Sequence, residues 1–175
     1  MADLNSKLQQ VKTGESFLER IKRYIPGYDG YVNRDNSREL DIQLRNTLAK
    51  NLDSNKTKLK NTILNLSKSG KLFESDGIDK IEKRIETSAA KFRSAARGYS
   101  GAFDVVKIKE EKLNQIYEFD ASMLEDVTEI GNLCSELENY TKANTDIKET
   151  QDKLGTSLDT LLKKFDEREN ILRNL

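Results

Sequence analysis

The stretch LNQIYEFDASMLEDVTEIGNLCSEL, residues 113–137, decides the fold class of this chain. Its apolar residues return at alternating steps of three and four, which is the spacing of one face of an α-helix. A helix over about 108–140 is therefore predicted. Only Asp120 interrupts the apolar row, so it is a candidate buried polar residue. We expect it to pair with an arginine of another helix, such as Arg93 or Arg97, or to line a polar pocket.

Three upstream segments show the same helical periodicity. Pro26 ends the first, because the residue before a proline avoids the helical conformation. Gly70 stands where a left-handed residue would close the second, and Asp76 is the candidate N-cap of the third. The predicted helices cover about 3–25, 37–69 and 77–97.

Short connections between long helices favour antiparallel neighbours. The sequence therefore predicts an all-α, up-down antiparallel helical bundle over residues 1–140. In that topology the 26–36 and 98–107 connections lie at one end of the bundle, and the 70–77 turn lies at the other.

The last segment, residues 141–175, carries apolar residues at heptad spacing from Ile147 to Leu172. A fifth helix can start near its beginning, but no Gly or Pro interrupts the junction, so a continuous or gently broken helix is favoured. This C-terminal helical or coiled-coil segment has no evident partner within the chain. A homo-oligomer formed through its seam is therefore one expected assembly.

The composition excludes several kinds of chemistry. The 175 residues include no His and one Cys, and 30 Lys+Arg balance 30 Asp+Glu. Sites that depend on imidazole cannot form, and the chain has neither a phosphate-binding loop nor a Cys-x-x-Cys pair. We predict no cofactor, no metal and no catalytic residue, and an inert Cys134. An enzyme or metal-binding protein that uses carboxylates, for example Glu125, Asp126 and Glu129, is the weaker alternative.

Two turns share the pattern Gly-Tyr-x-Gly, at residues 27–30 and 98–101, and each follows a basic helix end. Because both turns are expected at the same end of the bundle, their aromatic side chains would meet. The favoured interpretation is that they plug the open end of the bundle. The alternative is a partner surface, since aromatic residues and Arg are enriched at binding hot spots. The candidate partner-surface residues are Tyr24, Tyr28, Tyr31, Arg34, Arg97, Tyr99, Phe103 and Asp104.

Three strings extend this observation: Ile-Pro-Gly-Tyr-Asp-Gly-Tyr at 25–31, Gly-Tyr-Ser-Gly-Ala-Phe-Asp-Val-Val-Lys at 98–107, and Leu-Asn-Gln-Ile-Tyr-Glu-Phe-Asp at 113–120. With Arg34 and Arg38, they resemble motifs of a family of uncharacterised helical proteins of bacteria and archaea. The resemblance covers about residues 20–130. It implies that the two turns belong together, and it carries no activity and no catalytic residue over to this chain.

Charge is distributed unevenly along the chain. Lys+Arg minus Asp+Glu is +5 over residues 1–70 and −7 over 108–140, which favours attraction between helices of one chain or of two subunits. The pI of about 6.4 makes nucleic acid an unlikely partner. A membrane surface is a weak candidate, because Glu15 and Glu19 dilute the basic first helix and it lacks bulky apolar anchors.

No apolar leader or membrane span is evident, and one cysteine cannot form an internal disulfide. A cytoplasmic location is therefore expected. Together these features predict a non-enzymatic helical interaction or scaffold protein that binds a protein partner, or itself, through heptad seams and the Gly-Tyr turns. A peripheral membrane-associated adaptor is the alternative.

Overall fold

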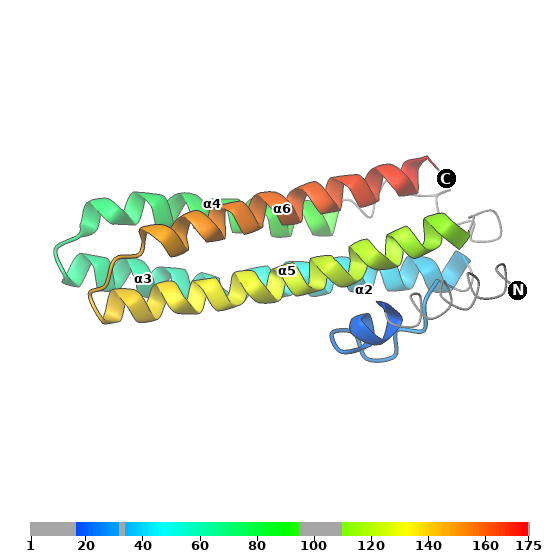
Figure 1. Ribbon diagram of the computed structural model, residues 1–175, viewed down its shortest axis with the longest axis horizontal. Coiled ribbons are helices and arrows are strands. Elements are labelled where there is room, and N and C mark those ends of the chain that lie inside the picture. The colour runs from blue at the N-terminus through cyan, green and yellow to red at the C-terminus, as the bar shows by residue number, and fades with distance from the viewer. Residues whose placement is uncertain (1–16, 32–33, 95–109, 175) are drawn as a thin grey trace, which may run out of the picture.

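The computed structural model describes residues 17–31, 34–94 and 110–174, and these ranges fold into helices without any strand (Figure 1). Residues 17–22 form a short helical segment. The remaining elements are α2 (Arg34–Asp53), α3 (Lys56–Lys68), the one-turn 3₁₀ helix η1 (Leu72–Glu74), α4 (Ser75–Ser94), α5 (Glu110–Lys142) and α6 (Lys148–Arg173). The predicted all-α class is confirmed.

The long helices pack as an antiparallel bundle, in which α2 and α3 follow one another along the same rod (Figure 1). This rod contacts α4 and α5, and α6 contacts α5 and α4. The chain runs up and down the bundle, so η1 and the 143–147 turn lie at one end. The 17–31 segment and the C-terminal end of α6 lie at the opposite end.

The predicted single helix over 37–69 is wrong, because the structure divides it into α2 and α3 at Ser54 and Asn55. The Asn55 side-chain amide donates to the carbonyl of Asn51 at 2.9 Å, and Ser54 Oγ donates to the same carbonyl at 2.7 Å. Such local bonds compete with the helical hydrogen-bond ladder and interrupt it. Leucines continue the apolar row on both sides, so periodicity alone does not reveal the break.

The preference for a continuous helix into the C-terminal segment is also wrong. Between α5 and α6 the chain reverses at Asn144, which adopts a left-handed φ of 56°. Thr145 N donates to Tyr140 O at 2.9 Å and Asn144 N donates to Thr141 O at 3.2 Å. This pair of bonds forms a Schellman C-cap. Asparagine tolerates the left-handed region better than most residues with a Cβ, so the helix ends without Gly or Pro.

Helix α6 folds back along α5 and joins the same core. Its heptad residues are covered by α4 and α5 of the same chain. The buried apolar members of this row are Ile147, Leu154, Leu158, Leu161, Phe165 and Leu172. The seam is not spare surface, so the reason for expecting a separate coiled-coil segment and a homo-oligomer through it does not hold.

Other helix ends agree more closely with the sequence. Gly70 has a φ of 75°, as predicted for the residue that closes the helix before it. Helix α4 begins at Ser75, so Asp76 lies in its first turn and is not the N-cap. The first helical segment ends at residue 22 rather than 25, and in the turn that follows Tyr24 N and Ile25 N both donate to Ile21 O, at 2.9 and 3.0 Å. The predicted helical residues 3–16, 95–97 and 108–109 lie outside the described ranges.

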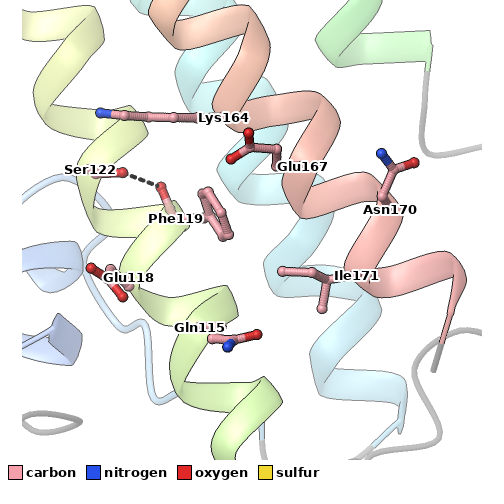
Figure 2. Close-up of a pocket in the computed structure, with 8 residues that line it drawn as sticks. All are labelled: Gln115, Glu118, Phe119, Ser122, Lys164, Glu167, Asn170 and Ile171. Carbon is pink, nitrogen blue, oxygen red and sulfur yellow. Dashed lines mark hydrogen bonds between the residues drawn. The ribbon is translucent and has the colours of Figure 1, made fainter.

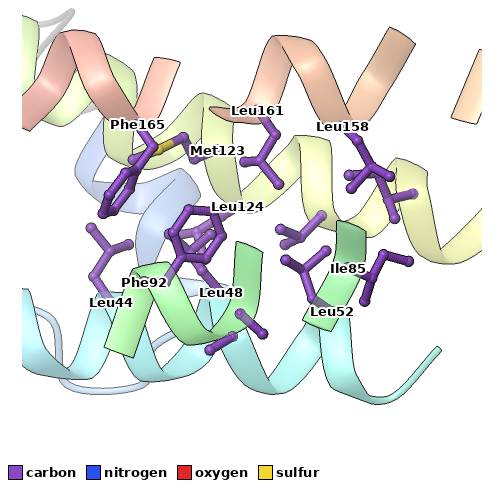
Figure 3. Close-up of a cluster of buried hydrophobic side chains, with 14 of the residues drawn as sticks. Leu44, Leu48, Leu52, Ile85, Phe92, Met123, Leu124, Leu158, Leu161 and Phe165 are labelled. Carbon is purple, nitrogen blue, oxygen red and sulfur yellow. The ribbon is translucent and has the colours of Figure 1, made fainter. Parts of the chain in front are cut away.

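Two aromatic rings mark the middle of the core. Phe92 of α4 and Phe165 of α6 lie with their ring centroids 4.5 Å apart. Leu44 and Leu48 of α2 and Met123 of α5 surround them (Figure 3). In the described ranges, no helix is both long and apolar enough to cross a membrane.

Candidate functional site

The first Gly-Tyr turn folds back into the end of the bundle. Tyr28 and Tyr31 are buried, with 0% and 3% of their surface exposed. Gly27 and Gly30 have φ values of 82° and 84°, a conformation that glycine adopts at little cost. A Cβ on Gly30 would lie 2.7 Å from the Tyr117 hydroxyl. Tyr28 and Tyr31 are therefore buried against α5 and do not form an exposed partner surface.

The two tyrosines meet Asp120 of α5. Tyr31 Oη donates to Asp120 Oδ2 at 2.5 Å, and Tyr28 Oη lies 3.4 Å from the same oxygen. The Tyr31 backbone N–H donates to Tyr117 Oη at 2.8 Å, and these two rings stack with centroids 5.4 Å apart. The turn is therefore held to α5 by hydrogen bonds as well as by apolar packing.

Arg168 of α6 completes the arrangement. Its Nε donates to Asp120 Oδ1, and its Nη2 donates to Tyr31 Oη at 2.9 Å. Its Nη1 lies 2.8 Å from Asp41 Oδ1. Asp120 is thus buried where it interrupts the apolar row, but its partner is Arg168. Arg93 instead pairs with Asp53 at 2.5 Å.

A second guanidinium extends the cluster across the bundle. Arg45 Nε donates to Asp41 Oδ2 at 2.6 Å, and Arg45 Nη2 donates to Glu169 Oε1 at 2.5 Å. We call these five charged residues, all less than 5% exposed, the buried ionic network; they are Asp41, Arg45, Asp120, Arg168 and Glu169. Its carboxylates and guanidiniums join α2, α5 and α6 with the 24–31 turn.

Burial governs the protonation of the network. It raises the pKa of Asp120, and the ion pair with Arg168 opposes that rise. It also raises the pKa values of Tyr28 and Tyr31 well above their usual range. Burial lowers the pKa of Arg168, but Asp120, Tyr31 and Asp41 outweigh this and raise it well above its ordinary value. Both phenols therefore stay protonated as donors at neutral pH, and Arg168 stays charged.

The remaining predicted site residues are placed differently. Tyr24 is partly buried and packs against the core. Arg34 begins α2, and its side chain lies outside the described part of the structure. The second Gly-Tyr turn, which includes Arg97, Tyr99, Phe103 and Asp104, lies outside the described ranges.

Of the three α5 carboxylates considered as possible metal ligands, Glu125 and Asp126 pair with cations of the same chain, and no ion pair of Glu129 is seen among the described residues. Arg20 Nε donates to Glu125 at 2.8 Å, and Lys164 Nζ donates to Asp126 at 2.7 Å. Nowhere in the described ranges do three or more metal-ligating side chains gather as a metal site would require. Cys134 is buried, and this raises the pKa of its thiol to about 12.

A groove of about 730 Å³ lies between α5 and α6, and Figure 2 shows the residues that line it. Its charged members, Glu118, Lys164 and Glu167, all remain accessible to water, so none of them adds a desolvated charge that would select a ligand. The residues that line it are Gln115, Glu118, Phe119, Ser122, Lys164, Glu167, Asn170 and Ile171.

Sequence reasoning missed the opposite end of the bundle. Next to Gly70, Phe73 and Leu72 of η1 are 81% and 58% exposed, and Leu64 of α3 is 51% exposed. No Asp or Glu occurs between residues 54 and 73, whereas this stretch holds several lysines. That absence of acids was the available signal. We call the solvent-accessible lysines and the exposed apolar residues here the basic tip; they are Lys60, Leu64, Lys68, Lys71, Leu72 and Phe73, of which Lys71 is half-buried.

The lysines of the basic tip differ in their ion pairing from Lys56, which lies near the start of α3. Lys56 pairs with Asp53 and Glu86 at 3.1 and 3.2 Å. Lys60, Lys68 and Lys71 form no ion pair with any residue that the structure describes. The basic tip thus combines uncompensated positive charge with exposed apolar side chains.

The resemblance of the Gly-Tyr turns to a helical family stays a prediction. Comparison with known proteins finds no family model, no curated protein and no solved structure that matches this chain.

Proposed function

We propose that this protein is a non-enzymatic helical interaction protein that binds an anionic partner through its basic tip. The observation that carries the proposal is the exposure of Phe73, 81% of whose surface is open to water. Large exposed apolar side chains beside charged ones are typical of binding surfaces. The neighbouring lysines carry positive charge that no ion pair compensates, so the partner's charge is expected to be negative.

The rest of the molecule supports this choice of surface. The heptad seam of α6 is covered by α4 and α5, and Tyr28 and Tyr31 are engaged by the buried ionic network. The interaction surface expected along the seam and at the first Gly-Tyr turn therefore moves to the other end of the bundle. A helical bundle with a binding surface at one end suits an adaptor, because the bundle holds the bound partner at a defined distance from its opposite end.

A photo-crosslinking amino acid at position 73 tests the proposal in cells of the source organism. The matched control carries the same amino acid at Thr160, which is exposed on α6. We expect a crosslinked adduct, with protein or lipid, from position 73 and not from position 160. Equal labelling at the two positions, or no adduct at position 73, would refute an interaction through the basic tip.

A further inference from the structure

We propose that the anionic partner of the basic tip is the headgroup layer of a phospholipid membrane, onto which the bundle docks by its end. This inference rests on the proposed function and names the partner. The protein would bind as a peripheral protein, with Phe73 and Leu72 in the interfacial layer and the lysines among the phosphates.

The lysines and apolar residues of the tip lie on continuous surface. Lys60, Leu64 and Lys68 are spaced four residues apart, so they share one face of α3. At the end of this helix Gly70 reverses the chain with a φ of 75°. The turn then presents Lys71 and the exposed side chains of η1.

The shape of the tip favours a bilayer over a protein. η1 is one turn long and stands at the end of the bundle, between α3 and α4 (Figure 1). A protein that accepts the protruding Phe73 ring needs a matching pocket, because protein interfaces are closely packed. A fluid interface accepts an aromatic ring without one, and combines it with attraction between lysines and anionic lipid.

The charge balance also supports an anionic surface. The first acids after Phe73 are Glu74, the last residue of η1 and immediately before α4, and Asp76, in the first turn of α4. They interact there with the positive end of the helix dipole, which reduces their effect on the lysines. Each lysine close to a membrane of anionic lipid strengthens binding by about five-fold.

Cosedimentation of the full chain with lipid vesicles tests this inference. The vesicles contain phosphatidylcholine either alone or mixed with phosphatidylserine, at low and at high salt. We expect binding only to the mixed vesicles, and its loss at high salt because exposed charges are screened. No binding to the mixed vesicles at low salt overturns the inference.

Variants with matched controls locate the binding surface. Phe73→Ser should weaken binding by about ten-fold or more, whereas Ile42→Ser, at a residue 48% exposed on α2, should leave it unchanged.

Lys68→Gln combined with Lys71→Gln should weaken vesicle binding by about 25-fold. Lys163→Gln, at a 79% exposed side chain on α6, removes charge elsewhere and should have little effect. Equal binding by the Phe73 and Ile42 variants overturns the inference.

A fluorescence reporter adds a readout that does not depend on sedimentation. The chain contains no Trp, so Phe73→Trp introduces a single one at the tip. Its emission should shift to the blue on the mixed vesicles, because the ring enters a less polar layer. The emission of Ile42→Trp should not shift, and a shift in that variant instead would overturn the inference.

The two proposals fail separately. If position 73 crosslinks to an acidic protein but this chain does not bind the vesicles, the lipid inference is wrong and the interaction function stands. If position 73 yields no adduct and the vesicles stay unbound, both are wrong.

Discussion

Loss of Arg168 tests the buried ionic network most directly. This side chain is 0% exposed and contacts Asp120, Asp41 and the Tyr31 hydroxyl. Arg168→Met keeps most of the aliphatic volume but removes the charge. Asp120 is then left in the core without a cation, and Arg45 alone must compensate Asp41 and its neighbour Glu169.

The expected cost is large. Removing one partner of a buried ion pair destabilises a protein by about 3–5 kcal/mol, because the other charge stays buried and uncompensated. The free energy of unfolding of a domain is only about 5–15 kcal/mol. In a chain of this length, each kcal/mol lowers Tm by about 2–4 °C, so we expect a fall of roughly 6–20 °C.

Thermal and urea unfolding, followed by far-UV circular dichroism, measure this effect. Lys163→Met serves as the control, because its side chain is 79% exposed, and should change stability by less than about 0.5 kcal/mol. Adding Asp120→Asn to Arg168→Met removes the stranded carboxylate and should recover part of the loss. A Tm for Arg168→Met within about 2 °C of the unsubstituted chain would refute the reasoning.

The Arg168→Met defect should also depend on pH. Burial already raises the pKa of Asp120, and Arg168 opposes that rise, so without the arginine the folded-state pKa rises further above the unfolded value of about 3.9. The folded state then binds a proton more tightly than the unfolded state, and stability falls as pH rises through this interval. The deficit relative to the unsubstituted chain should therefore narrow as pH falls from neutral toward about 4. A deficit that widens in acid would contradict this.

Three further predictions concern the packing. Deleting residues 143–175 removes α6 and exposes the core faces of α4 and α5, so the shortened chain should lose its cooperative unfolding transition and aggregate in light scattering; a transition near that of the full chain would contradict this. Gly30→Ala should lower Tm more than Gly27→Ala, because both have positive φ but only Gly30 lies against Tyr117; equal shifts would show that the contact is unimportant. Cys134, buried with its pKa raised to about 12, should resist alkylation at mildly alkaline pH until denaturant is added, and rapid alkylation of the folded chain would contradict its placement.

Several helix ends could be predicted because their residues have one strong local preference. Gly70 is the clearest example, since a left-handed φ is easy for glycine and the residue stands at the end of an apolar row. Asn144 performs the same role at the end of α5, but asparagine also fits many other positions. The break at Asn55 was missed for a related reason, because its side-chain bond to Asn51 leaves the apolar spacing unchanged.

The candidate sites were predictable only in part. Asp120 is conspicuous in an apolar row, so its burial follows from periodicity. Its partner Arg168 lies on another helix, and no local rule distinguishes this arginine from the others. Phe73 was not singled out in the sequence analysis, because whether a turn side chain packs inward or is exposed to water depends on how neighbouring helices meet.

By itself, the sequence determined that this chain forms long amphipathic helices, because apolar periodicity and helix ends depend on residues only a few positions apart. Tertiary structure alone decided that α6 covers the core rather than extending beyond it, that Arg168 compensates Asp120, and that Phe73 is left exposed. These outcomes depend on which helix faces meet across the bundle. That choice is governed by the total burial of apolar surface and the pairing of buried charges, which are properties of the whole chain rather than of any segment.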